Sequence, residues 1–143
     1  PHRHFQLLRR NNWEKICPRF DWFSSLLFDH KIIKSDIKNS IAIRARNNNT
    51  CSNAEELFCA YKSMCIDMDL GNEKTNNKPS KPYNLLITND WIALVLRSTD
   101  RSYGFSINAL GFAGYFLGTK SSNLDILTKF GPDKILKQVV EPL

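Results

Sequence analysis

Long apolar runs are scarce in this sequence. The longest weakly polar stretch, residues 105–118, contains Ser106 and Asn108. It is shorter than the roughly 20 apolar residues that a transmembrane helix needs. Residues 1–4 also lack the apolar segment and the small-residue cleavage site of a secretory signal. We therefore expect no membrane span, although a targeting segment ahead of Pro1, which is not Met, would be invisible here.

Cysteine is also sparse, and no C-x-x-C pair occurs among Cys17, Cys51, Cys59 and Cys65. The chain has 143 residues, of which 42% are hydrophobic and 24% charged, so it can bury a core without disulfide bonds. This composition excludes collagen-like, low-complexity and wholly disordered proteins. We expect reduced thiols, a cytoplasmic location and a globular fold of about one domain in size.

Acidic residues are few in the first third of the chain. Residues 1–50 hold ten Lys or Arg and four Asp or Glu, whereas residues 51–143 hold ten of each, so the net charge of +6 arises entirely from the first third. Such an excess indicates a polyanionic partner, either nucleic acid or a nucleotide with several phosphates, or else a solvated basic face. The basic residues concerned include Arg3, Arg9, Arg10, Arg19, Lys31, Lys34, Lys38, Arg44 and Arg46.

Residue periodicity predicts a mixture of strands and helices. Residues 41–46 alternate as in a strand, and apolar residues at spacings of three and four predict a helix from Ser52 or Asn53 to Leu70, ended by Gly71. That stripe is typical of a core face, so we expect no chemistry at its cysteines. Residues 22–33 follow Pro18 without a clean period and are predicted to be a loop with short strands.

The second half of the chain is predicted to contain a hairpin and two helices. Strands at 83–88 and 91–97 are separated by Asn89 and Asp90, which tolerate the left-handed conformations of tight hairpins. A further short strand is expected at 105–108. The glycines of residues 110–114 are expected to let two backbones come close. Helices at 123–130 and 133–140 are expected to be broken at residues 131–132.

The opening residues place chemically active side chains in one row. If residues 2–8 form a strand, its period of two puts His2, His4 and Gln6 on the same face. An imidazole can attack an electrophile, whereas the amide of Gln6 can form hydrogen bonds but cannot protonate a leaving group. This combination favours group transfer over hydrolysis. The alternatives are a zinc site, for which His30 and the cysteines have no ligand spacing, and a surface position without function.

The segment P-H-R-H-F-Q at residues 1–6 resembles the active-site strand of the histidine triad superfamily, in the branch that carries Gln in place of the third histidine. Residues 82–88, Trp91, Arg97, residues 106–114 and residues 131–136 are similar in order and spacing to the carboxyl-terminal region of ATP adenylyltransferases, also called diadenosine tetraphosphate phosphorylases. The resemblance covers residues 1–12 and 82–140, and the stretch between them shows no further recognised motif.

This resemblance implies a reversible phosphorolysis of diadenosine tetraphosphate. His4 would attack the α-phosphorus, release ATP and carry AMP, which phosphate would then remove as ADP. Gln6 would bind a non-bridging phosphate oxygen, and His2 would orient the phosphates. The implied partners are nucleotides and phosphate. The sequence assigns no cofactor with certainty, no metal ligands are expected, and Mg²⁺ with the nucleotide substrate is left open.

Two polar residues of the second half are candidate substrate ligands. Asn108 interrupts an apolar run beside glycines, although it could instead satisfy backbone groups in a turn. Arg97 carries a guanidinium suited to phosphate, although an arginine at a strand end is often solvated.

The resemblance implies an α+β fold with a histidine-triad-like antiparallel sheet and flanking helices, lacking its amino-terminal half. Residues 1–78 would form the catalytic-strand portion, and residues 79–143 the carboxyl-terminal region. We expect a missing amino-terminal segment in the same chain or a companion chain. The functional alternatives are a dinucleoside polyphosphate hydrolase and a non-catalytic basic module that binds nucleic acid.

Overall fold

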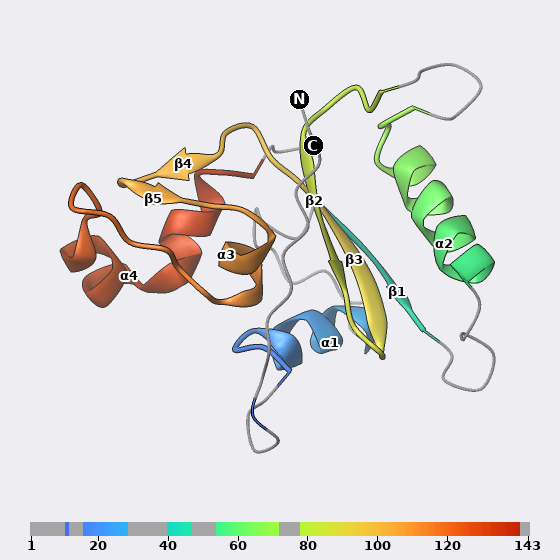
Figure 1. Cartoon of the computed structure of the whole chain (residues 1–143), viewed down its shortest axis with the longest axis horizontal. Coiled ribbons are helices and arrows are strands. Elements are labelled where there is room, and N and C mark those ends of the chain that lie inside the picture. The colour runs from blue at the N-terminus through green and yellow to red at the C-terminus, as the bar shows by residue number, and fades with distance from the viewer. Residues whose placement is uncertain (1–10, 12–15, 29–39, 47–53, 72–77, 141–143) are drawn as a thin grey trace.

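The computed structural model describes residues 11, 16–28, 40–46, 54–71 and 78–140, and shows an α+β fold with an antiparallel sheet and flanking helices (Figure 1). The predicted strand at 2–8 and the predicted helix caps Ser52 and Asn53 lie outside the described residues. The elements are α1 (Phe20–Phe28), β1 (Ile41–Ala45), α2 (Ala54–Asp67), β2 (Tyr83–Ile87), β3 (Trp91–Leu96), β4 (Arg101–Ser102), β5 (Phe105–Ser106), α3 (Ala109–Ala113) and α4 (Leu124–Lys137).

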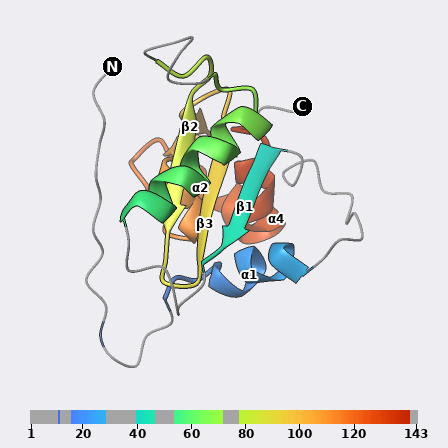
Figure 2. The same cartoon turned by 90° about the vertical axis from the view of Figure 1, so that its right-hand side faces the viewer.

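The main sheet has the strand order β1-β3-β2, and both strand pairs are antiparallel. All six residues of the central strand β3 are buried because helices cover both faces of the sheet. Leu94 and Leu96 face α2, whereas Trp91 and Val95 face a cluster formed with α1, α3 and α4. Figure 2 shows α2 in front of the strands and α4 behind them.

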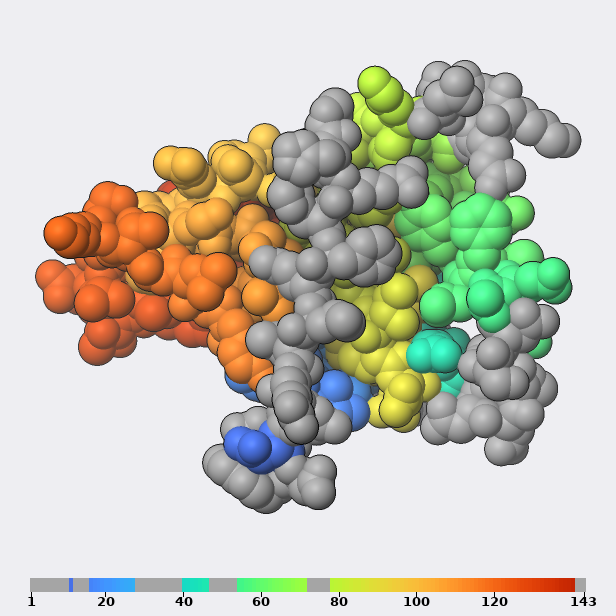
Figure 3. Space-filling view, in the orientation of Figure 1, coloured from blue at the N-terminus to red at the C-terminus, as the bar shows by residue number. Residues whose placement is uncertain are grey.

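The cluster that Trp91 and Val95 form with α1, α3 and α4 holds the larger part of the core. Phe23 of α1 stacks on Trp91, with ring centroids 4.9 Å apart and an angle of 28° between the ring planes. Ile135 and Leu136 of α4 are fully buried in the same cluster. In the space-filling view, α4 and the β4–β5 hairpin form the left-hand part of the surface and α2 the right-hand part (Figure 3).

The hairpin prediction is confirmed, but its turn is built differently. Tyr83 pairs with Leu96, and this register leaves Asn89 and Asp90 as the two loop residues. Neither loop residue has a positive φ. Instead, the Thr88 hydroxyl accepts hydrogen bonds from the backbone N–H groups of Asp90 (3.2 Å) and Trp91 (3.1 Å), so a side chain closes the turn.

The helix predicted up to Leu70 ends earlier, at Asp67. Asp69 takes the left-handed conformation (φ 53°), its N–H donates to the Ile66 carbonyl, and the Leu70 N–H donates to the Cys65 carbonyl at 2.8 Å. These two hydrogen bonds define a Schellman motif, in which Asp69 holds the position predicted for Gly71. A short polar side chain can adopt this conformation at low cost.

The prediction of a loop at 22–33 is wrong for residues 22–28, which belong to α1. Phe20, Phe23 and Leu27 recur at helical spacing and pack on the main core, so the apolar residues do have a period once Phe20 is included. Pro18 lies just ahead of the helix, where its missing N–H breaks no helical hydrogen bond. Residues 29–33 lie outside the described residues.

Both glycine predictions in the carboxyl-terminal part are confirmed. Gly131 has non-helical φ and ψ values of 75° and 175° and divides α4 into two helical pieces ahead of Pro132. Gly114 ends α3 with a φ of 106°. The Arg19 N–H donates to the Ala113 carbonyl at 3.1 Å, so two backbones do approach each other beside Gly114.

Candidate functional site

The sequence-predicted catalytic residues His2, His4 and Gln6 lie outside the described residues, so their roles stay predictions. Arg97 and Asn108 lie within the described residues. Their surroundings show which polar groups the fold brings together.

Asn108 is the N-cap of α3. Its Oδ1 atom accepts hydrogen bonds from the backbone N–H groups of Leu110 (2.9 Å) and Gly111 (3.4 Å). This is the structural alternative that the sequence left open, because capping satisfies helix N–H groups that have no partner within the helix. A substrate contact by Asn108 stays a prediction.

Arg97 directly follows β3 and extends the ladder with β2. Its backbone N–H donates to the Pro82 carbonyl at 3.1 Å, so the alternation along β3 places its side chain on the face of Trp91 and Val95. The Arg97 Nε atom is buried and has no hydrogen-bond partner. The next residue, Ser98, donates its backbone N–H to the Val139 carbonyl at 2.9 Å and thereby fixes this end of the sheet.

Asn84 was not predicted as a site residue, yet its polar side chain is a diagonal neighbour of Arg97 in the β2–β3 register. It lies on β2 opposite Val95, on the same face of the sheet as Leu86. Its exposed fraction is only 9%, and its Nδ2 atom is buried without a hydrogen-bond partner. A buried amide left in this way costs about 1–3 kcal/mol of stability, so a polar residue here calls for a reason.

Asn84 and Arg97 occupy a diagonal of the β2–β3 ladder. Asn84 faces Val95, and Arg97 lies two residues further along β3. Diagonal neighbours in an antiparallel pair are roughly 7–8 Å apart, within reach of a long side chain. Both unpaired atoms are hydrogen-bond donors, so this corner can bind a group that only accepts hydrogen bonds, such as an oxyanion. A sequence signal existed: Asn84 stands at an inward-facing position in an apolar strand.

Among the described residues no hydrogen bond joins Arg97 to Asn108, so the structure gives no direct link between the two predicted ligands. Asn84 and Arg97 therefore form the candidate site that the fold itself assembles. Asn108 belongs to the cap of a neighbouring helix, which packs against β2.

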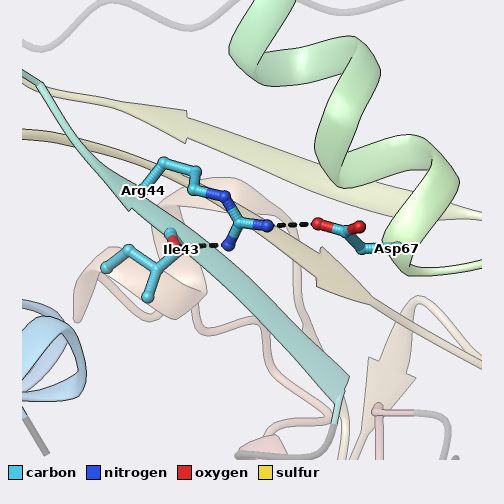
Figure 4. Close-up of polar contacts among 3 residues, drawn as sticks. All are labelled: Ile43, Arg44 and Asp67. Atoms are coloured by element: carbon cyan, nitrogen blue, oxygen red, sulfur yellow. Dashed lines mark hydrogen bonds and ion pairs between the residues drawn. The ribbon is translucent and has the colours of Figure 1, made fainter.

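The described arginines on β1 and just after it have structural partners. Figure 4 shows the Arg44 guanidinium between the Ile43 carbonyl and the Asp67 carboxylate at the end of α2. The Arg46 guanidinium donates to the Thr88 carbonyl in the hairpin turn. These two side chains therefore stabilise the sheet and its contact with α2.

Arg19 is likewise part of the packing. Its Nη1 atom lies 2.7 Å from the Asp133 carboxylate, and the guanidinium carbon lies 4.3 Å from the centre of the Trp22 ring. The Nε and Nη2 atoms are buried without partners, but the charge is neutralised by Asp133. Arg19 connects the start of α1 to the second part of α4.

Two partly or fully buried side chains of α2, Cys65 and Tyr61, have ionised forms that the fold disfavours. Cys17, Cys59 and Cys65 form no disulfide. Burial raises the pKa of the Cys65 thiol, so its thiolate is disfavoured. The Tyr61 and Tyr83 hydroxyls lie 2.6 Å apart, and burial together with this hydrogen bond raises the pKa of Tyr61. Cys65 and Tyr61 support the predicted core role of α2, whereas Cys59 is exposed and Cys17 belongs to the cluster on the other face of the sheet.

The described ranges contain neither a cluster of metal ligands nor a membrane-spanning helix. Within them no three His, Cys, Asp or Glu side chains are grouped so that they could hold a metal ion. Nor does this part of the chain contain a helix long and apolar enough to span a bilayer.

The fold class and the family follow from comparison with known proteins. The α+β arrangement is similar to a crystal structure of yeast Ap4A phosphorylase Apa2, with a TM-score of 0.52 and 24% sequence identity over 76% of this chain. A family model for the ATP adenylyltransferase C-terminal domain matches residues 24–142. The chain therefore belongs to the ATP adenylyltransferase C-terminal domain family. No curated protein matches the sequence.

The extent of these matches bears on the predicted organisation. This chain covers 39% of the Ap4A phosphorylase chain. The family match begins at residue 24, after the segment with His4, and it includes residues 24–81, where the sequence showed no recognised motif. It crosses the predicted boundary between residues 78 and 79, and β1 pairs with β3 across that boundary. The division into 1–78 and 79–143 stays a prediction.

Proposed function

We propose that this chain is the carboxyl-terminal part of a nucleotidyltransferase that cleaves diadenosine tetraphosphate with phosphate to give ATP and ADP. The observation that carries the proposal is the family match across residues 24–142. It is supported by the similarity of the fold to that of yeast Ap4A phosphorylase Apa2. The H-x-H-x-Q motif at the start of the sequence supplies the chemistry.

The proposed reaction has two steps. His4 attacks the α-phosphorus, so that a P–N bond forms, the P–O bond to the triphosphate breaks, and ATP leaves. Phosphate then attacks the same phosphorus, the P–N bond breaks, and ADP leaves with His4 restored. Gln6 binds a non-bridging oxygen and His2 orients the phosphates, which stabilises the charge that develops during transfer.

Arg97 and Asn108 contribute to substrate binding in this proposal. The guanidinium of Arg97 lies at the end of β3 and carries the charge suited to a phosphate group. Asn108 uses Oδ1 to cap α3, so any contact with the nucleotide comes from its Nδ2 atom. Further segments, in the same chain or a companion chain, supply the remaining nucleotide contacts.

The test is formation of a covalent adenylate. The protein, isolated as its cell produces it, is mixed with ATP labelled at the α-phosphorus, and the protein-bound label is measured. We expect an adduct that is labile in acid, is discharged to ADP by phosphate and is absent from His4→Ala. His30→Ala, which removes the histidine outside the motif, serves as the matched control. A labelled adduct that persists in His4→Ala would refute the proposed intermediate.

The same preparation separates the proposal from its alternatives. Incubation with diadenosine tetraphosphate, with and without phosphate, should release ADP and ATP only when phosphate is present. Equal turnover without phosphate would instead indicate a hydrolase. Binding to nucleic acid that weakens steeply with salt and survives His4→Ala, without nucleotide turnover, would indicate a basic binding module.

A further inference from the structure

We infer that Asn84 and Arg97 form a phosphate-binding corner at the end of the β2–β3 ladder, and that Asn84 is a substrate-positioning residue. The inference rests on the proposed function, which supplies the nucleotide. It adds Asn84 as a phosphate-binding residue that the sequence motifs did not indicate. Its starting point is the pair of buried donors, Nδ2 of Asn84 and Nε of Arg97, that project from neighbouring strands.

The chemistry of the unpaired atoms selects the ligand. Both atoms are donors, so a partner that satisfies them must accept hydrogen bonds. Arg97 adds a full positive charge, and among the described residues no carboxylate pairs with it. The Arg19 and Arg44 side chains, in contrast, are matched by Asp133 and Asp67. A phosphate group offers several anionic oxygens to such a pair of donors.

The backbone holds the two donors in a fixed arrangement. Asn84 lies within β2, Arg97 continues the ladder through its bond to Pro82, and Ser98 is tied to residues 139 and 140. Donors on paired strands need little reorganisation when a ligand arrives, which favours binding. Asn84 is also neutral, so it directs the phosphate without adding another charge to a buried position.

Stability and affinity measured together distinguish a phosphate-binding role of Asn84 from a structural one. An apolar residue of similar size would fill the same position and leave no unpaired donor, so Asn84→Leu should not destabilise the fold and should raise its melting temperature. If Asn84 serves phosphate binding, the same substitution weakens that binding. Opposite changes in stability and affinity are therefore the signature of the inferred role.

The experiment uses the 143-residue chain with sodium tripolyphosphate, ATP and adenosine as probes. Calorimetry measures affinity, and NMR follows the Asn84 side-chain amide and the Arg97 Nε–H resonances. We expect tripolyphosphate and ATP, but not adenosine, to shift both resonances. Arg97→Met should lower the affinity about ten- to a hundredfold and Asn84→Leu about two- to tenfold.

Matched controls separate this site from general charge effects. Arg101→Met removes an exposed arginine of β4, and Asn89→Leu alters the exposed hairpin turn. Both variants should bind tripolyphosphate like the unchanged chain. Asn84→Asp keeps the size of the side chain but replaces the donor with a carboxylate, so its affinity should fall at least as far as that of Asn84→Leu.

Two results would overturn the inference. One is unchanged affinity in both Asn84 variants, and the other is resonance shifts that are as large with adenosine as with tripolyphosphate. Because tripolyphosphate binding needs no reaction, the outcome is independent of the His4 adduct. Phosphate bound at this corner without an adenylate adduct would refute the proposed function alone, and an adduct without binding at this corner would refute this inference alone.

Discussion

The close approach at Gly114 makes the junction between α3 and α1 sensitive to a single added carbon. Gly114 ends α3 in the left-handed region, with a φ of 106°. A Cβ atom at this position would lie 2.7 Å from Pro18 Cβ and 3.3 Å from Arg19 Cγ. We therefore predict that Gly114→Ala destabilises the chain by separating α3 from the segment that leads into α1.

The magnitude follows from two contributions. Left-handed backbone costs a residue with a Cβ about 1–2 kcal/mol relative to glycine. Carbon atoms pack best at about 3.5–4.0 Å, so Pro18 must move by about 1 Å. That movement weakens the Arg19–Ala113 backbone hydrogen bond, which is worth about 0.5–1.5 kcal/mol. The sum is about 1.5–3.5 kcal/mol, or a melting temperature lower by roughly 10 °C.

Urea unfolding followed by circular dichroism measures this change. Gly118→Ala is the matched control, because the nearest atoms to its added Cβ lie at 3.8 Å and its φ is not positive. We expect that control to be unchanged or more stable by up to about 1 kcal/mol. The stability of Gly114→Asn should fall between the two, because asparagine tolerates the left-handed backbone but its Cβ atom still clashes with Pro18. Equal stability of Gly114→Ala and Gly118→Ala would refute the reasoning.

Other predictions concern side-chain pairs. Tyr61→Phe and Tyr83→Phe should each cost about 1 kcal/mol in urea unfolding because each leaves one part-buried hydroxyl unpaired, whereas the double variant should recover much of that loss. The pKa of Tyr61 is raised in the folded chain, so the unfolded chain releases this proton at lower pH. The stability of the fold should therefore fall as the pH rises above about 10, and it should fall less in Tyr61→Phe. Asp133→Ala should cost about 1–2 kcal/mol, because it leaves the largely buried Arg19 charge without its carboxylate; a loss below that of Arg44→Ala would contradict this. Arg44→Ala removes the exposed ion pair of Figure 4 and should change stability by less than about 1 kcal/mol.

Elements with a strong local pattern could be predicted from the sequence. The apolar spacing of α2 and the β-rich runs of the β2–β3 hairpin specify these elements without reference to the rest of the fold. The kink at Gly131 is equally local, because glycine adopts a backbone conformation there that other residues disfavour. The family resemblance of residues 82–140 is also confirmed by the match over residues 24–142.

Elements whose form depends on distant partners were harder to predict. Among the described side chains of the aromatic-rich α1 only Phe23, which stacks on Trp91, is fully buried, whereas Trp22 packs beside Arg19 and is partly exposed. Its apolar residues therefore do not form one narrow stripe. The end of α2 depends on which residue takes the left-handed conformation, and Asp69 competes for that position with the glycine that follows.

The sequence by itself determined which residues alternate, which recur at helical spacing, and that an imidazole pair opens the chain. Only the tertiary structure decided that Asn84 and Arg97 share one corner. Their proximity arises from the register of β2 on β3, in which Asn84 pairs with Val95. A shift of one residue would turn either side chain to the opposite face, so the pairing of strands, and no local preference, creates the site.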